Sequence, residues 1–178
     1  MGDKAGEGHA HGNLGICYDS VGDFKKAIEH HKRHLKVAKE AGDKAGEGGA
    51  HGNLGEGYYS LCDFKKAIKH HERHLKIAED MRDKAGEEGA YRNLGNVYHR
   101  LGDFRKAIEH YQRCLQIAKE VGNKAGEGQA HANLGNGYNR LGDLRKAIEH
   151  YERHLKISKE VGDKAGEGRA SEIGRAHV

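Results

Sequence analysis

The sequence has no proline and no tryptophan, and hydrophobic residues make up only 35% of its 178 positions. Such a lean apolar fraction cannot fill a thick globular core, so we expect a thin, extended core. No run approaches the roughly 18 consecutive apolar residues that a membrane span requires, and the first residues lack the apolar stretch of a signal peptide. These absences predict a soluble, cytoplasmic protein that does not enter a membrane.

An excess of charge of one sign is also missing, because 31 basic residues are interleaved with 27 acidic ones. No basic stripe alternates with aromatic residues, as a platform for single-stranded nucleic acid requires, so we expect no nucleic-acid partner. The cysteines are only three, Cys17, Cys62 and Cys114, and their uneven spacing predicts neither a disulfide framework nor a metal-ligand set. We expect reduced thiols, as in the cytosol.

What the sequence does have is a repeat. The segment Asp-Lys-Ala-Gly-Glu begins at Asp3, Asp43, Asp83 and Asp163, and a copy that opens with Asn begins at Asn123. These starts define four 40-residue repeats and the start of a truncated fifth, at residues 3–42, 43–82, 83–122, 123–162 and 163–172. Self-similarity at a fixed period predicts stacked units, since one such unit cannot bury its apolar face alone.

Each repeat is predicted to form two helices, at residues 4–20 and 24–39 in the first copy. Ala27, Ile28 and Leu35 fall on one face of the second helix. Asp residues that follow the turn stand where the helix N-cap belongs. In the glycine-rich first helix, Gly15 allows a close approach between helices, and we expect Leu14 to pack across the seam. The predicted fold class is all-α.

The repeat resembles the tetratricopeptide repeat signature. The resemblance is carried in all four copies by columns that read, in the first copy, Asn13-Leu14-Gly15, Tyr18, Gly22-Asp23-Phe24, Ala27-Ile28-Glu29 and Leu35. The family's usual tryptophan is replaced by His11, His51, Tyr91 and His131. The resemblance implies a right-handed superhelical solenoid of stacked antiparallel helix pairs, whose first helices line a concave surface that holds an extended peptide.

The length of the repeat and its Asp-Lys-Ala-Gly-Glu-Gly opening resemble those of the LGN/Pins spindle-orientation adaptors. This subgroup implies a protein–protein interaction scaffold, with no enzymatic activity and no cofactor. Similar long repeats leave two alternatives open. One is a regulatory sensor segment of a larger signalling ATPase, and the other is a cargo adaptor like the kinesin light chains.

The resemblance also implies which residues bind the peptide. These are Asn13, Asn53, Asn93, Asn133, Arg92, Asn96, His99, Arg100, Asn136, Asn139 and Arg140. An asparagine amide both donates and accepts, so a ladder of amides suits a peptide backbone, while the arginines suit carboxylates and predict an acidic partner segment. Two alternatives remain: the asparagines tie neighbouring helices together, and the arginines form a solvated face.

Other patterns give no chemistry. His30 and His34 lie one helical turn apart and could share a metal ion, but the neighbouring His31 shares its column with Tyr111, as a half-buried packing residue would, so we expect no metal site. The glycine run at residues 6–12 follows no strand, and no Gly-Lys-Ser/Thr motif is present, so a phosphate loop is not expected. No nucleophile stands beside a matching base.

Both ends of the sequence look cut. Met1 stands in register with Met81, which indicates a fragment of a longer array, and the uncapped ends would permit end-to-end self-association. Residues 173–178 read as the translation of a sequencing-adapter oligonucleotide, and we interpret them as an artefactual tail.

Overall fold

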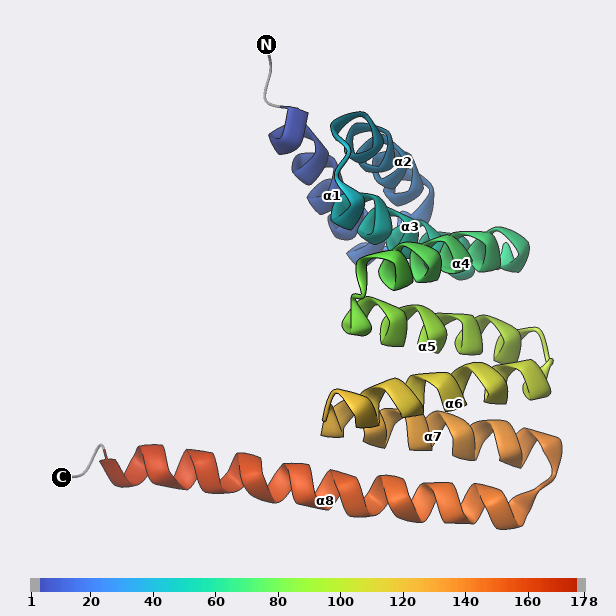
Figure 1. Cartoon of the computed structure of the whole chain (residues 1–178), viewed down its shortest axis with the longest axis vertical. Coiled ribbons are helices and arrows are strands. Elements are labelled where there is room, and N and C mark those ends of the chain that lie inside the picture. The colour runs from blue at the N-terminus through green and yellow to red at the C-terminus, as the bar shows by residue number, and fades with distance from the viewer. Residues whose placement is uncertain (1–3, 176–178) are drawn as a thin grey trace. The chain divides into compact units, whose positions relative to one another are not determined.

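The computed structural model describes the backbone of residues 4–175 and the side chains of residues 6–162. This part of the chain holds eight helices and no strand, which confirms the all-α prediction (Figure 1). The helices are α1 (Lys4–Ser20), α2 (Phe24–Ala41), α3 (Lys44–Ser60), α4 (Phe64–Met81), α5 (Lys84–Arg100), α6 (Phe104–Glu120), α7 (Lys124–Leu141) and α8 (Leu144–Arg175). Of the tail expected at 173–178, residues 176–178 lie outside the described part.

The chain divides into two units, residues 1–103 with α1–α5 and residues 104–178 with α6–α8. In the first unit each helix packs against the next, and α1 also contacts α3, as α3 contacts α5. In the second unit α7 packs against both α6 and α8. Short turns make successive helices antiparallel within each unit (Figure 1). Consecutive antiparallel packing of helix pairs is therefore confirmed, while the repeat boundaries themselves stay a prediction.

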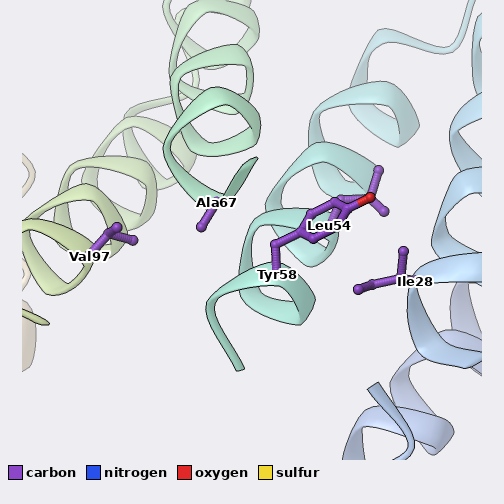
Figure 2. Packing of buried hydrophobic residues seen from close by; sticks show 5 residues of the cluster. All are labelled: Ile28, Leu54, Tyr58, Ala67 and Val97. Atoms are coloured by element: carbon purple, nitrogen blue, oxygen red, sulfur yellow. The ribbon is translucent and has the colours of Figure 1, made fainter. Parts of the chain in front are cut away.

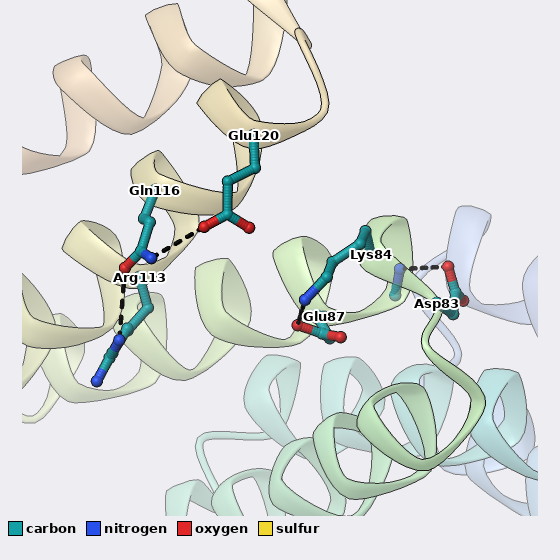
Figure 3. Close-up of polar contacts among 7 residues, drawn as sticks. Asp83, Lys84, Glu87, Arg113, Gln116 and Glu120 are labelled. Carbon is teal, nitrogen blue, oxygen red and sulfur yellow. Dashed lines mark hydrogen bonds and ion pairs between the residues drawn. The ribbon is translucent and has the colours of Figure 1, made fainter.

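The repeated opening segment has a structural role at the start of the first helix of a repeat. Asp83 caps α5 by accepting a hydrogen bond from the backbone nitrogen of Gly86 at 3.0 Å (Figure 3). A Cβ at Gly86 would lie 2.5 Å from the Asp83 carboxylate, so this position needs glycine. Lys84 donates to Glu87 at 2.8 Å across one turn. The four residues thus satisfy the helix start and pin the first turn.

The second helices carry polar contacts between residues three or four positions apart. Arg113 donates to Gln116 at 3.4 Å, and Gln116 donates in turn to Glu120 at 2.9 Å (Figure 3). On α8 the carboxylate of Glu149 lies 3.9 Å from Arg145. These contacts are on the solvated side of the helices, where a pair contributes little to stability.

The turn inside each repeat requires a left-handed residue. Gly22, Gly102 and Gly142 have φ angles of 81°, 79° and 82°, and Cys62 takes the same place in the second repeat with φ 59°. A side chain in this region costs about 1–2 kcal/mol, because Cβ approaches the following carbonyl oxygen. The second repeat therefore carries local strain that the others avoid.

Replacing Cys62 with glycine is expected to raise the free energy of unfolding by about 1 kcal/mol, because the strain disappears at a modest cost in chain entropy. The midpoint of urea denaturation measures the change. Cys62→Ser, which keeps the Cβ and removes the thiol, should give no such gain. A gain in both variants would assign the effect to the thiol and not to the backbone.

The buried hydrophobic residues lie between neighbouring helices. In the first unit the core contains Ile28 of α2, Leu54 and Tyr58 of α3, Ala67 of α4 and Val97 of α5, all buried (Figure 2). Each helix contributes a few side chains, and each side chain meets the helix before or after its own. Stability must therefore come from contacts between neighbours along the array.

Leu14 was expected to pack across the seam as the rest of its column does, and this prediction is wrong. Leu54, Leu94 and Leu134 are fully buried, whereas Leu14 is 44% exposed. The buried leucines are covered by the helix that precedes theirs, and within the described residues no helix covers that side of α1. The burial of a leucine at this repeat position thus depends on the presence of a preceding helix, because the residue type is the same in all four repeats.

Helix α8 runs unbroken from Leu144 to Arg175, past position 163, where the fifth repeat is expected to start. At the corresponding earlier turns Gly42, Arg82 and Gly122 have positive φ angles, whereas Gly162 does not. The backbone thus continues as a helix through the residues expected to open a new repeat. The truncated fifth repeat stays a prediction.

Candidate peptide-binding wall

The predicted site residues share one face of the first helices. In α5, Asn96 lies four residues from Arg92 and from Arg100 and three from Asn93 and from His99, which places all five on one side of the helix. We call this side the A-helix wall; α1, α3 and α5 carry its part in the first unit and α7 its part in the second. Because α1 contacts α3 and α3 contacts α5, the first-unit part is continuous.

The asparagine column is only partly accessible. Asn53, Asn93 and Asn133 are half-buried, whereas Asn13 is exposed on α1. Asn133 accepts a hydrogen bond of 3.3 Å from Gln129, one turn earlier in its own helix. The bond engages the amide oxygen of Asn133 and not its nitrogen. Because both residues lie on α7, the bond does not connect two helices. Peptide binding by this column stays a prediction.

A second asparagine column behaves differently. Asn136 is exposed and accepts a hydrogen bond of 2.7 Å from the hydroxyl of Tyr151 on α8. The bond fixes the orientation of this amide and joins the two helices of the fourth repeat. Asn96 is half-buried in the same column, His99 is half-buried nearby, and Asn139 is exposed.

The two arginines at the ends of α5 and α7 occupy the same repeat position. Both side chains are exposed, yet each is placed over an aromatic ring. The guanidinium of Arg100 lies 5.6 Å from the centre of the Tyr59 ring, and that of Arg140 lies 5.2 Å from the Phe104 ring. Stacking on a ring holds a guanidinium in position while its N–H groups remain able to bind a carboxylate.

The first-unit part of the wall also carries acidic groups. Glu56 is exposed, but the wall around it removes enough solvent to raise the pKa of its carboxyl group; Arg92 opposes this effect and Asp19 adds to it. Asp19 is in turn bound at 2.9 Å to the ring of His31, which is fully buried. The wall is therefore acidic on α1 and α3 and basic on α5.

Sequence reasoning missed Asp19 and Tyr59 as wall residues. They share a column with His99 and Asn139, so the 40-residue period alone could have identified them. The sequence also predicted that His31 is half-buried, but His31 is 0% exposed, and His71 at the same repeat position is 1% exposed. Each ring packs directly against a glycine, because a Cβ at Gly15 or Gly55 would lie within 2.4 Å of the imidazole. The missing side chain leaves room for the whole ring between the two helices.

The described residues contain no cluster of three or more His, Cys, Asp or Glu side chains placed as metal ligands. Cys17 and Cys62 are exposed free thiols, and Cys114 is a buried one. In the part of the chain that was searched, none of the helices combines the length and the apolar character needed to cross a bilayer.

Comparison with known proteins identifies the family. A model of the tetratricopeptide repeat matches residues 6–80 and 87–160, which is most of the chain. The chain therefore belongs to the tetratricopeptide repeat family. Repeats of this family generally act as non-catalytic scaffolds for protein–protein interaction. A search of curated proteins finds no match.

Solved structures show the same fold. BtubC (BKLC) from P. vanneervenii is 24% identical, with a TM-score of 0.84 over 91% of this chain and 67% of that one. Aspartyl phosphate phosphatase F from Bacillus subtilis is 16% identical, with a TM-score of 0.87 over 92% of this chain and 43% of that one. A signal-transduction ATPase with numerous domains and a tetratricopeptide repeat sensor, from Pyrococcus horikoshii, is 21% identical, with a TM-score of 0.83 over 93% and 26%. This chain spans less than half of the latter two proteins.

Proposed function

We propose that the chain is a scaffold whose A-helix wall binds an extended segment of a partner protein, and that the partner residues bound by α5 in the first unit, like those bound by α7 in the second unit, are acidic. The observation that carries this proposal is the pair of exposed, ring-stacked arginines, Arg100 and Arg140. A positioned guanidinium binds a carboxylate in two parallel hydrogen bonds and loses little side-chain entropy in doing so. No covalent step and no cofactor is required.

The acidic groups of the wall refine the proposal. In the first unit, Asp19 and Glu56 would repel an acidic segment, whereas Arg92 and Arg100 would attract it. We therefore place the acidic partner residues of this unit opposite α5. In the second unit, Arg140 would attract acidic residues to α7 by the same argument. The half-buried amides of Asn53 and Asn93 would hold its backbone.

Selection of random 16-residue peptides displayed on phage tests this proposal, with the full chain as the immobilised target. Enriched peptides should be rich in Asp and Glu, and Arg100→Glu together with Arg140→Glu should weaken their binding by about ten- to a hundred-fold, the value of one or two charge-assisted hydrogen bonds. Arg145→Glu is the matched control, because Arg145 is exposed on α8 and away from the wall.

Circular dichroism must show equal helix content in the variants. If no peptide is enriched, the wall does not bind peptides. If enriched peptides bind the double variant as well as the unchanged chain, the arginines form only a solvated face.

Three finer assignments of function differ in their support. The sensor alternative is favoured by the likeness to the Pyrococcus horikoshii protein, whose repeats are described as a sensor in a signal-transduction ATPase. A phosphate-loop domain encoded next to this chain would support that role. The LGN/Pins-like adaptor role rests on repeat length and on the opening segment alone, and none of the comparisons above supports it. The cargo-adaptor role would need an adjacent heptad coiled coil.

Self-association through the ends also stays a proposal. On α8, Ile148 is 57% exposed, whereas Ile28 and Ile108 at the same repeat position are buried. Leu155 on α8 is 55% exposed, whereas Leu35 and Leu115 at its repeat position are half-buried. Ile28 meets Gly57 of α3 and Ile108 meets Gly137 of α7, so the exposed face has the chemistry of an internal interface.

A further inference from the structure

Three of the four repeats place two histidine rings against each other. The Nδ1 atoms of His11 and His30 are 3.0 Å apart, and those of His51 and His70 and of His131 and His150 are each 2.9 Å apart. In each histidine pair the first ring comes from the first helix of the repeat and the second from the second helix. At this distance one Nδ1 donates its hydrogen and the other accepts it.

Each pair is held in place by its surroundings. Tyr58 stacks on His70 with 5.4 Å between ring centres and an angle of 18°, and the ammonium of Lys66 lies 5.1 Å above the Tyr58 ring. The same arrangement of tyrosine and lysine occurs at His30 and at His150. The rings therefore cannot rotate apart without disturbing a stack of four side chains.

The surroundings of the second pair oppose a positive charge. The groups that face His51 and His70 are Lys32 and Lys39 of α2, Glu47 of α3, and Lys69 and Arg73 of α4. Glu47 is the one acidic group among them, and it is already bound to Lys44 at 2.8 Å. Among the described residues, Nε2 of His51 has no hydrogen-bond partner, so an imidazolium there would hold a buried N–H without an acceptor.

The titration of this pair follows from these facts. Burial lowers the pKa of His51 to about 4, with further lowering by His70, Lys39 and Arg73, while Glu47 raises it. Burial, followed by Lys69, Lys32 and Lys39, also lowers the pKa of His70. Both rings are thus neutral at pH 7.

The histidine pairs of the fourth and first repeats have similar neighbours. Burial lowers the pKa of His131 to about 4, followed by His150, Lys119 of α6 and Arg153 of α8, while Glu127 of α7 raises it. The pKa of His150 is lowered by burial and Arg153, against Glu149, with Lys119 adding a little. In the first pair the pKa of His30 is lowered by burial, His11 and Arg33, against Glu29, and His31 adds a little.

We propose that each histidine pair is a proton-operated latch between the two helices of its repeat, closed while the pair carries at most one extra proton and opened when both rings are charged. A pair with one extra proton keeps its N–H···N bond. A doubly charged pair would bring two N–H groups and two positive charges together at about 3 Å, so the rings, and the helices that carry them, must separate. The A-helix wall lies on the same first helices.

The third repeat supplies an internal comparison, because it has Tyr91 where the others have the first histidine. It keeps His110 on its second helix, and burial lowers the pKa of this ring. The second repeat also has His71, whose pKa burial lowers to about 4 on the other side of α4. Acid sensitivity should therefore be largest in α3 and α4, substantial in α7 and α8, and smallest in α5 and α6.

The direction with pH is fixed by the lowered pKa values. Consider a histidine whose pKa is near 6.5 in the unfolded state and near 4 in the folded state. Its contribution to the stability of the folded state is complete above about pH 6.5 and is lost as the pH falls toward 4, because the unfolded state then binds the proton more tightly. One such group raises the ratio of opened to closed molecules by about thirty-fold when the pH is lowered from 7.5 to 5.

Hydrogen exchange of the full chain, read by mass spectrometry at pH 7.5 and pH 5 and corrected for intrinsic rates, tests the latch. Protection should fall by at least ten-fold more in α3, α4, α7 and α8 than in α5 and α6. His51→Tyr, which copies the third repeat, should return about ten-fold of the lost protection to α3 and α4 only. His9→Gln, at an exposed histidine outside the pairs, should change nothing.

Equal loss of protection in all four repeats, or an unchanged loss in α3 and α4 of the His51→Tyr variant, would overturn the proposal. If that variant is unfolded at pH 7.5, the comparison among repeats in the unchanged chain still decides. Nitrogen-15 spectra of the histidine rings give a second reading: at least one ring of the His51–His70 pair must remain neutral at pH 6, and titration of both rings near 6.5 would also overturn the latch.

Discussion

Replacing Gly55 with alanine is expected to lower the free energy of unfolding by about 2–3 kcal/mol, the cost of forcing an extra methyl group into a packed core. A Cβ at this position would lie 2.4 Å from Cε1 of His71 and 2.5 Å from its Nδ1. The ring is 1% exposed and cannot move into solvent, so α3 and α4 must separate. The intrinsic helix preference of alanine returns only about 1 kcal/mol of this loss.

Gly49 in the same helix is the matched control. It is exposed, and a Cβ there would meet nothing within 4 Å. Gly49→Ala should therefore raise the free energy of unfolding by about 0.5–1 kcal/mol, since only helix propensity changes. Urea denaturation of both variants separates the steric cost of the added methyl group at Gly55 from the gain in helix propensity at Gly49. The two changes in the free energy of unfolding should have opposite signs.

A double-mutant cycle identifies the contact responsible. His71→Ala removes the ring and should make the added methyl group at Gly55 nearly harmless, so the double variant should be more stable than the sum of the two single changes predicts. Additive losses would show that the cost of Gly55→Ala arises elsewhere. A Gly55→Ala variant as stable as the unchanged chain would contradict the close approach of α4 to the α3 backbone.

The features that could be predicted from the sequence are local ones that recur. The helix bounds follow from caps such as Asp43 and Asp63, whose carboxylates accept the bonds expected of them, and from turn glycines with positive φ. The buried face of the second helices follows from the spacing of residues such as Ala27 and Ile28. Because the pattern occurs in four copies, a substitution in one copy, such as Cys62 in place of glycine, does not change the prediction of the helix bounds.

The features that could not be predicted depend on contacts between helices. His11 and His30 are 19 residues apart, and their meeting follows only from the register between α1 and α2. The placement of Arg100 over Tyr59 joins two different repeats. Propensity and periodicity carry no information on such contacts, so the sequence identified the arginines of the wall but neither the rings that hold them nor the histidine pairs.

Leu54→Ala is expected to lower the free energy of unfolding by about 3 kcal/mol, through lost burial and the cavity left between α2 and α3. Leu54 is 0% exposed and lies in the cluster with Ile28 and Tyr58 (Figure 2). Because stability in a repeat array is a sum over neighbouring interfaces, this loss falls on one interface inside the first unit. Urea denaturation measures the total, and hydrogen exchange should show the loss concentrated in α1–α4.

Leu14→Ala is the matched comparison, since the same residue stands at the same repeat position. Leu14 is already 44% exposed and should cost less than about 1 kcal/mol, because the removed atoms are largely in water and little cavity forms. The difference between the two variants measures how much a covering helix contributes to a leucine of this column. Equal losses of stability in the two variants would mean that another surface covers Leu14 in solution. If the loss caused by Leu14→Ala also grew with protein concentration, that surface would belong to a second copy of the chain.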